Sequence, residues 1–215
     1  MPVAFRDPAP ITLLRLREAL YPLAALPTGD GWNHDELSDL LLPEAVAAEA
    51  AVLVPLVPRE TGLRVLLTRR TDLLRHHPGQ VSFPGGKVED ADADVVVAAL
   101  REAEEEVGLP RSQAQPLGYL DPLATVTGFR VLPVVARIDP AFVAVPDPSE
   151  VSDVFEVPLD WLMARGNLQH VAIDYRGRNR EVLEFLRPPS APSQRIWGAT
   201  ASILFNLRER LERLP

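Results

Sequence analysis

Hydrophobic residues recur with a helical spacing in three segments of the chain. The leucines of residues 11–23 predict an amphipathic helix that ends before Pro22 or Pro27, because proline cannot continue a helix. Residues 95–107 predict a second helix, and residues 196–214 predict a third. Helices are therefore expected near the start, in the middle and at the end of the sequence.

The middle helix carries signals at both of its ends. Asp94 is a typical N-cap residue, because its carboxylate can accept a hydrogen bond from a free N–H of the first turn. Gly108 and Pro110 mark the other end, since glycine readily adopts the left-handed conformation that closes many helices. Alanines and Val107 supply the apolar face, so we expect a helix over residues 95–107.

Runs of β-branched and other apolar residues predict strands between these helices. They cover residues 50–57, 63–68, 81–83, 117–120, 131–138, 154–157, 168–175 and 181–186. Residues 58–62 and 176–179 contain glycine between paired runs and predict hairpin turns. Short strands with one central and one terminal helix indicate an α+β fold.

The N-terminal part is expected to differ from the rest. Residues 28–33 are a polar, glycine-containing joint, and residues 36–42 predict a helical turn. We expect residues 1–45 to form a helical extension packed on a main domain of residues 46–215. A homodimer contact through this extension is a second expectation. The N-terminal extension carries no recognisable catalytic or metal-binding motif.

Composition fits one globular domain. The chain has 215 residues, of which 47% are hydrophobic and 24% charged, so it can bury a sizeable core. It has no apolar run of about 18 residues and no basic segment before an apolar core at its start, so we expect neither membrane insertion nor secretion. The absence of cysteine excludes disulfides and predicts a reducing, cytoplasmic location.

A net charge of −8 argues against a general nucleic-acid partner, because an acidic chain repels phosphate backbones. A small anionic substrate remains compatible with this charge if local arginines and a metal ion surround it.

The candidate chemistry begins on the predicted helix 95–107. Glu102, Glu105 and Glu106 fall on one flank within roughly 100° of arc. Like charges this close destabilise a helix, whereas a hard divalent cation would reverse the penalty. Glutamate-rich faces are more often simply solvated, and Arg101 with Glu105 forms an ordinary i,i+4 pair.

The surrounding residues resemble the Nudix box. Its pattern is Gly, five residues, Glu, seven residues, then Arg-Glu-aliphatic-any-Glu-Glu-any-Gly-aliphatic. Residues 101–109 match the second half, with Ala103 as the small apolar position. Counting from Gly86 puts the first acidic position on Asp92, whereas counting back from Arg101 puts it on an alanine, so the loop between carries one inserted residue.

A second signature narrows the resemblance to coenzyme A pyrophosphatases. Their extended motif reads Leu-Leu-Thr-any-Arg-small, then Arg, three residues, Gly, three residues, Phe-Pro-Gly-Gly. Residues 66–86 resemble it, with the fixed positions on Arg70, Arg75, Gly79 and residues 83–86. Thr71 departs from it, standing where Ser or Ala is usual. Later patches at 150–159 and 196–201 also match the subgroup.

The resemblance implies an α/β/α sandwich with a mixed sheet. It also implies metal-dependent hydrolysis, with Mg²⁺ or Mn²⁺, of the diphosphate bond of coenzyme A or its derivatives. The products would be 4′-phosphopantetheine, or its acyl form, and 3′,5′-ADP. A related alternative is a Nudix pyrophosphatase for ADP-ribose or another dinucleotide. A different alternative is a nucleotide sensor that binds without catalysis.

The expected metal ligands are Glu102 and Glu106, with Glu105 as a further ligand or as the group that orients a metal-bound water. The resemblance adds the carbonyl of Gly85. Residues 83–86 predict a tight glycine turn that brings backbone close to a ligand.

Three residues are expected to have structural roles. Arg101 would brace the helix through Glu105, while Gly86 shapes the turn and Gly108 ends the helix. The general base is left open between Glu105 and Glu150, which precedes a predicted strand.

Substrate contacts are expected from the basic and polar residues of the extended motif. Arg70, Arg75 and Lys87 could bind the diphosphate and the 3′-phosphate of coenzyme A, because guanidinium groups match phosphate geometry. Gln80 is a candidate for a polar contact. His77 is a candidate hydrogen-bond donor to phosphate rather than a catalyst.

Overall fold

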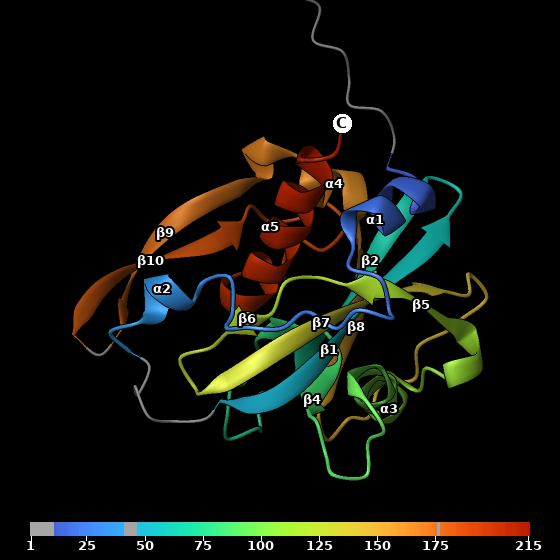
Figure 1. Ribbon diagram of the computed structural model, residues 1–215, viewed down its shortest axis with the longest axis horizontal. Coiled ribbons are helices and arrows are strands. Elements are labelled where there is room, and N and C mark those ends of the chain that lie inside the picture. Colours follow the sequence, from blue (N-terminus) through green and yellow to red (C-terminus); the bar gives the residue numbers. More distant parts are fainter. Residues whose placement is uncertain (1–10, 41–46, 176) are drawn as a thin grey trace, which may run out of the picture.

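The computed structural model describes residues 11–40, 47–175 and 177–215. The helical elements are α1 (Leu13–Ala19), α2 (His34–Leu37), α3 (Val95–Val107), η1 (Arg111–Gln113), α4 (Leu159–Met163), η2 (Arg165–Asn167) and α5 (Gly198–Glu212). The strands are β1 (Ala48–Arg59), β2 (Gly62–Arg70), β3 (Val81–Ser82), β4 (Gly85–Lys87), β5 (Ala114–Tyr119), β6 (Leu123–Ala124), β7 (Phe129–Ile138), β8 (Val151–Pro158), β9 (Leu168–Tyr175) and β10 (Arg178–Phe185). Figure 1 shows their arrangement.

The central sheet is mixed. Its path is β3-β2-β1-β7-β5, and β4, β6 and β8 pair with β1, β7 and β2 respectively. β1 and β7 are parallel, with Ala48 beside Phe129, whereas β1 and β2 form an antiparallel hairpin that turns between Arg59 and Gly62. The predicted α+β class and the hairpin at residues 58–62 are therefore confirmed.

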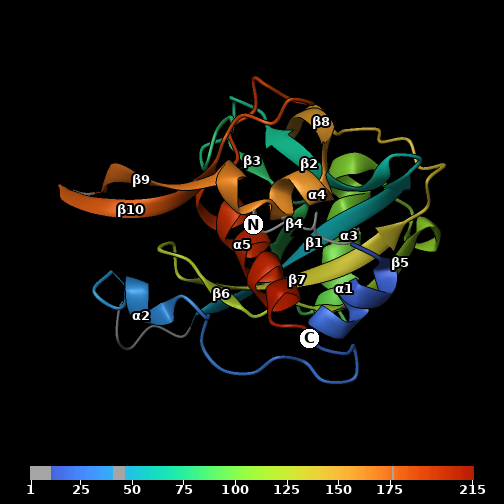
Figure 2. The ribbon, with the colours of Figure 1, turned by 90° about the horizontal axis from the view of Figure 1, so that it is seen from above.

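Helices cover both faces of this sheet, with α3 on one side and α1 and α5 on the other (Figures 1 and 2). Side chains alternate between the two faces of a strand. Along β1, Ala51, Leu53 and Val57 pack with the α3 side chains, whereas Val54 and Leu56 pack with those of α1 and α5. The α/β/α arrangement is therefore the one that the resemblance implied.

Helix α3 has the predicted bounds. The Asp94 carboxylate accepts a hydrogen bond from the Val97 N–H at 2.9 Å, and Gly108 closes the helix at a φ of 66°. Ala99 and Ala103 are fully buried against the sheet. Local signals at both ends were enough to define this element, because they act within one helical turn.

The N-terminal elements are shorter than predicted. α1 ends at Ala19 because the chain returns to an extended conformation, in which Tyr21 exchanges backbone hydrogen bonds with Tyr119 at 3.0 and 2.9 Å. Leu16 is buried in the core cluster that includes α5. Helix α2 covers the start of the predicted turn, and residues 41–46, including the expected domain boundary, lie outside the described residues.

Two later features complete the fold. Helix α4 was not predicted; it buries Leu159 and Leu162 directly after β8. The β9–β10 hairpin projects from the body of the molecule (Figure 2) and contacts the segment just after α2 through ion pairs from Arg178 and Arg180 to Asp39. Among the described helices, none is long and apolar enough to cross a membrane.

Candidate active site

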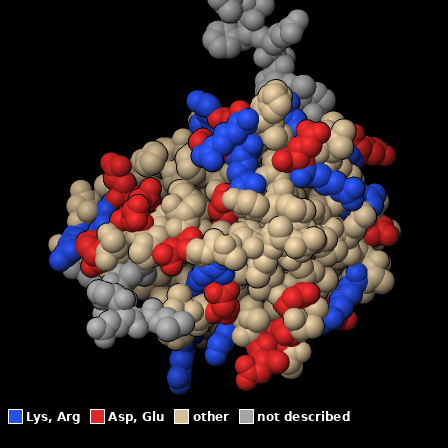
Figure 3. Space-filling model, in the orientation of Figure 1, with Lys and Arg blue, Asp and Glu red and all other residues tan. Residues whose placement is uncertain are grey.

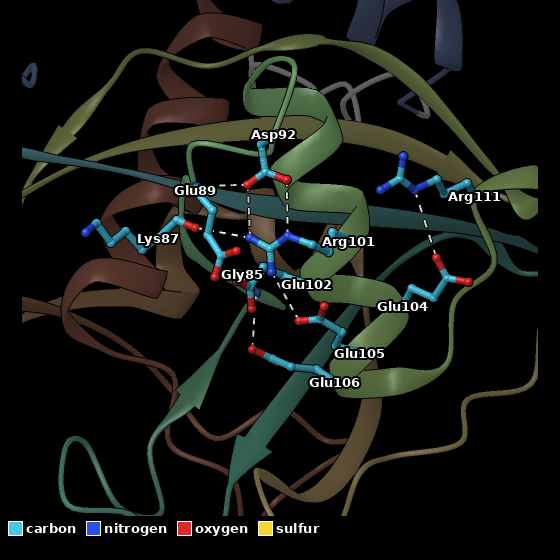
Figure 4. Close-up of polar contacts among 10 residues, drawn as sticks. All are labelled: Gly85, Lys87, Glu89, Asp92, Arg101, Glu102, Glu104, Glu105, Glu106 and Arg111. Atoms are coloured by element: carbon cyan, nitrogen blue, oxygen red, sulfur yellow. Dashed lines mark hydrogen bonds and ion pairs between the residues drawn. The ribbon is translucent and has the colours of Figure 1, made fainter.

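Two carboxylates of α3 lie directly against the backbone of β4 (Figure 4). The Gly85 N–H donates to Glu106 Oε1 at 3.4 Å. A Cβ atom added to Gly86 would lie 2.5 Å from Glu102 Oε1. Residues four apart on a helix share a face, so α3 presents both side chains to the same strand.

The predicted tight turn at residues 83–86 is wrong. Gly85 and Gly86 belong to β4, which pairs antiparallel with β1, and neither has a positive φ. The structure requires glycine here for another reason. A Cβ on Gly85 would lie 2.4 Å from the carbonyl oxygen of Ala51. The absence of a side chain at Gly85 thus leaves room for β1, and its absence at Gly86 leaves room for the Glu102 carboxylate.

Glu106 is the buried member of the glutamate cluster. Glu106 is 3% exposed. Burial raises the pKa of its carboxyl group to about 8, although the hydrogen bond from the Gly85 N–H and the charge of Arg70 both act to lower that pKa. Its Oε2 accepts no hydrogen bond from any described residue. A buried carboxylate with an unpaired oxygen is costly, and a bound cation would offset that cost. This oxygen fits a hard divalent ion.

Glu102 and Glu150 add negative charge to the same region. Burial raises the pKa of Glu102, the charge of Arg101 lowers it, and the nearby carboxylates Glu105 and Glu150 raise it further. The Glu150 charge also raises the pKa of Glu106. Three glutamates, Glu102, Glu106 and Glu150, therefore share one electrostatic environment.

Backbone hydrogen bonds hold the Glu150 loop beside α3. The Val145 and Asp147 N–H groups donate to the carbonyls of Val107 and Glu106, both at 2.9 Å. These are among the last carbonyls of α3, which a helix leaves without an internal partner. The Thr71 N–H donates to the Glu150 carbonyl at 2.8 Å. The loop is thereby tied both to α3 and to the end of β2.

Arg101 joins the helix to the loop before it (Figure 4). It donates to Glu105 at 3.1 Å, the predicted i,i+4 contact, and to Glu102 at 2.9 Å. It also makes two hydrogen bonds to Asp92, at 3.1 and 3.0 Å, and one to the Lys87 carbonyl. These contacts with Asp92 raise the pKa of Arg101 and lower that of Asp92.

Asp92 was not among the predicted site residues. Its side chain is only 4% exposed and holds Arg101 against the loop. The sequence did contain a signal for Asp92, because it is the sixth residue after Gly86, where the Nudix pattern has its first acidic position. If Asp92 holds the acidic position, the inserted residue lies between Asp92 and Arg101.

Arg70 is the predicted substrate residue that the structure brings to the carboxylates. It ends β2 and is half-buried. Its charge lowers the pKa of Glu106, so the guanidinium acts electrostatically on that carboxyl group. Its buried Nε donates to no described residue. Arg70 and Glu106 therefore each bury one polar atom that has no hydrogen-bond partner among the described residues.

The other predicted substrate residues are more exposed. Arg75 and His77 lie on the surface of the loop that joins β2 to β3, and Gln80 is half-buried where that loop ends. His77 has a φ of 54°, which is uncommon for a residue other than glycine. Lys87 is exposed on β4. Among the described residues, no hydrogen bond or ion pair links these four side chains to Glu102 or Glu106.

The metal-ligand prediction is compatible with the arrangement of Glu102 and Glu106. Within the described parts of the chain, no three Asp, Glu or His side chains converge in the manner of a complete metal site. Mg²⁺ commonly takes one or two carboxylates and completes its shell with water and substrate phosphate oxygens. The Glu105 side chain is 58% exposed and is paired with Arg101, so Glu102 and Glu106 are better placed.

Acidic side chains also gather at the lower edge of the molecule, over the loop between β4 and α3 (Figure 3). Glu89, Asp90 and Asp94 are exposed there. An anionic substrate approaching this edge meets repulsion, so local positive charge is needed to bind it.

The NUDIX domain family model matches residues 48–176, which include β1 to β9 and every carboxylate of the candidate site. This chain belongs to the Nudix family. Relatives from Klebsiella pneumoniae and Shigella flexneri, both named "Uncharacterized Nudix hydrolase NudL", are 43% and 45% identical over 169 residues. Each alignment covers 78% of this chain and 84% of the relative.

Solved Nudix structures resemble a smaller part of this chain. The Nudix hydrolase RenU from M. smegmatis is 26% identical, with a TM-score of 0.45, over 53% of this chain and 72% of that protein. The family match and the NudL relatives assign the chain to the Nudix hydrolases, which hydrolyse the diphosphate of nucleoside diphosphate derivatives.

Proposed function

We propose that this Nudix hydrolase cleaves the diphosphate bond of coenzyme A or its derivatives, releasing 4′-phosphopantetheine, or its acyl form, and 3′,5′-ADP. The observation that supports this substrate is the position of Arg70 and the loop that follows it. This segment resembles the coenzyme A motif, and it leads from the unpaired guanidinium of Arg70 to the glycines against Glu102 and Glu106.

Glu102 and Glu106, together with the Gly85 carbonyl, would hold Mg²⁺ or Mn²⁺. When bound, the metal would neutralise charge on the phosphate oxygens and lower the pKa of a coordinated water. Burial keeps the Glu106 carboxylate away from bulk water, and Gly86 leaves room for Glu102 to approach β4. Glu105 would serve as a further ligand or orient the attacking water.

Two carboxylates are candidates for the general base. Glu105 lies on the same helix as the proposed ligands but is paired with Arg101. Glu150 is exposed, and its charge acts on both Glu102 and Glu106. A base must reach the water that it deprotonates, directly or through another water. The hydrogen bond from the Thr71 N–H to the Glu150 carbonyl holds that loop at the end of β2.

Positive and polar side chains would bind the substrate around this centre. Arg70 would bind a diphosphate oxygen through its guanidinium group. Arg75 and Lys87 are exposed and would meet the remaining phosphates, including the 3′-phosphate. Gln80 and His77 would add hydrogen bonds from the same loop.

The test is a chromatographic screen of coenzyme A, ADP-ribose, NADH and diadenosine polyphosphates, with Mg²⁺ and then with Mn²⁺. Glu106→Gln should lower hydrolysis by orders of magnitude, because it removes a carboxylate oxygen proposed to bind the metal. Glu104→Gln is the matched control. Glu104 lies on the same helix, but its side chain is 55% exposed and faces Arg111 at 3.9 Å, away from β4 (Figure 4).

Four results would bear on the proposal differently. Cleavage of coenzyme A well ahead of the other compounds would support it. Preference for ADP-ribose would overturn the substrate but keep the metal site. Equal loss of activity in the Glu104 and Glu106 variants would overturn the role given to Glu106, and no turnover with either metal would overturn the assignment as an active hydrolase.

A further inference from the structure

Arg69, the second-last residue of β2, contacts the loop that follows this strand and the start of β8. Its Nη2 donates to both carboxylate oxygens of Asp72, at 2.8 and 3.0 Å, and its Nη1 donates to the Ser152 hydroxyl at 2.9 Å. A Cβ on Gly79 would lie 2.5 Å from Asp72 Oδ1 and 3.0 Å from Arg69 Nη2. Both ends of the loop 71–80 and the start of β8 therefore meet at one guanidinium.

Ser152 lies at an irregularity in the pairing of β2 with β8. Arg69 lies opposite Asp153, and Arg70 lies opposite Val151, so the ladder passes over Ser152. The Ser152 hydroxyl instead donates to the Arg69 carbonyl at 3.1 Å. A bulge redirects the strand and is common beside active sites. Arg69 thus binds the bulged residue through both its side chain and its backbone.

The segments that meet at Arg69 carry residues of the proposed site. Loop 71–80 carries Arg75, and the chain just before Ser152 carries Glu150. The tip of the loop has little support of its own, since Leu73 on it is 91% exposed. A loop with few buried contacts takes its position from the residues that hold its base.

We infer that Arg69 is a positioning residue. It fixes the position of loop 71–80 relative to the start of β8, which Glu150 directly precedes. The inference rests on the proposed function, because it gives Arg75 and Glu150 their roles. A guanidinium suits this task, because its donors lie in one rigid plane and hold Asp72 and Ser152 together. A lysine ammonium at the same position would hold one of them at a time.

Exposure separates this role from a role in overall stability. The Arg69 and Asp72 side chains are 30% and 69% exposed, and exposed ion pairs contribute little to the free energy of unfolding. Loss of Arg69 should therefore act on the loop and leave the rest of the fold in place.

The first experiment is amide hydrogen exchange on Arg69→Met, Arg69→Lys and wild type, without substrate. Exchange in the segments around residues 70–80 and 150–153 should rise by at least on the order of tenfold in Arg69→Met, because the charge-assisted hydrogen bonds to Asp72 and Ser152 are lost. It should rise less in Arg69→Lys and remain unchanged in α3. Arg165→Met is the matched control, because it removes a guanidinium that binds Glu212 through two nitrogens elsewhere.

The second experiment is a double-mutant cycle with Arg75→Ala, measured as kcat/KM for the substrate that wild type hydrolyses. Arg69→Met alone should lower kcat/KM about 10- to 100-fold, since a misplacement of about 1 Å can cost on the order of 100-fold. If Arg69 acts by positioning Arg75, its effect should largely disappear in the Arg75→Ala background.

The outcomes separate this inference from the proposed function. Unchanged exchange in Arg69→Met, or fully additive kinetic effects, would overturn the positioning role while wild-type hydrolysis stands. Absence of coenzyme A hydrolysis in wild type would overturn the proposed substrate, and the exchange measurement would still decide whether Arg69 holds the loop.

Discussion

Alanine at Gly86 should inactivate the enzyme without unfolding it. The added Cβ would lie 2.5 Å from Glu102 Oε1, 2.6 Å from Cδ and 2.8 Å from Oε2. Ordinary contact begins at 3.4 Å, so the carboxylate must move by about 0.9 Å. A misplacement of about 1 Å can cost on the order of 100-fold in rate, or about 2.7 kcal/mol of transition-state stabilisation.

The free energy of unfolding should change little in Gly86→Ala. The atoms that meet the new methyl group belong to the end of a flexible side chain, which is 17% exposed and can rotate away. Gly85→Ala is the matched comparison. Its Cβ would lie 2.4 Å from the Ala51 carbonyl oxygen, so β1 itself must shift, at a cost of about 1–3 kcal/mol or more.

The assay pairs urea unfolding, followed by circular dichroism, with kcat/KM for hydrolysis. Gly86→Ala should keep the wild-type unfolding midpoint and lose activity, whereas Gly85→Ala should lose stability. In a Glu102→Gln background, Gly86→Ala should have little further effect, because both changes act through one carboxylate. Wild-type activity in Gly86→Ala, or destabilisation equal to that of Gly85→Ala, would refute the reasoning.

Three further changes test separate parts of the structure. Mn²⁺ at about 100 times its dissociation constant should stabilise the wild type by about 2.7 kcal/mol in thermal unfolding and should not stabilise Glu106→Gln; equal shifts would contradict the ligand assignment. Arg75→Ala should raise the KM for coenzyme A more than for its 3′-dephospho form, and equal effects would show that Arg75 does not bind the 3′-phosphate. Asp121→Asn should lower the free energy of unfolding at neutral pH by about 1–3 kcal/mol. Burial alone would raise the pKa of Asp121, but hydrogen bonds, led by those of Asn206 and Arg210, lower it below 3.8. That stabilisation is present above about pH 3.8 and is lost as the pH falls through the folded-state pKa. A difference in unfolding free energy between variant and wild type that persists below this pKa would be evidence against it.

Local sequence was sufficient wherever the deciding interactions lie within a few residues. Asp94 and Gly108 set both ends of α3, because an N-cap and a left-handed glycine act on the adjacent turn. The hairpin between β1 and β2 followed from its turn residues in the same way. Helix α4 was missed because it is only five residues long and its two leucines pack against distant parts of the core.

The glutamates show the limit of a pattern. Glu105 and Glu106 are adjacent and chemically identical in the sequence, and helical spacing placed both on the candidate flank. In the structure one side chain is 58% exposed and the other residue is 3% exposed. The difference arises because α3 packs on the sheet with Glu106 turned towards β4, an orientation that depends on strands distant in sequence.

The sequence by itself determined the family, the helix that bears the carboxylates and the residues available to bind metal and phosphate, because motif spacing and end signals are local. Only the tertiary structure decided that Gly85 and Gly86 form a strand rather than a turn, and that Asp92 is the chief partner of Arg101. It also decided that the Glu150 loop lies beside α3. These outcomes depend on strand pairing and helix packing between segments far apart in the chain, which no local pattern specifies.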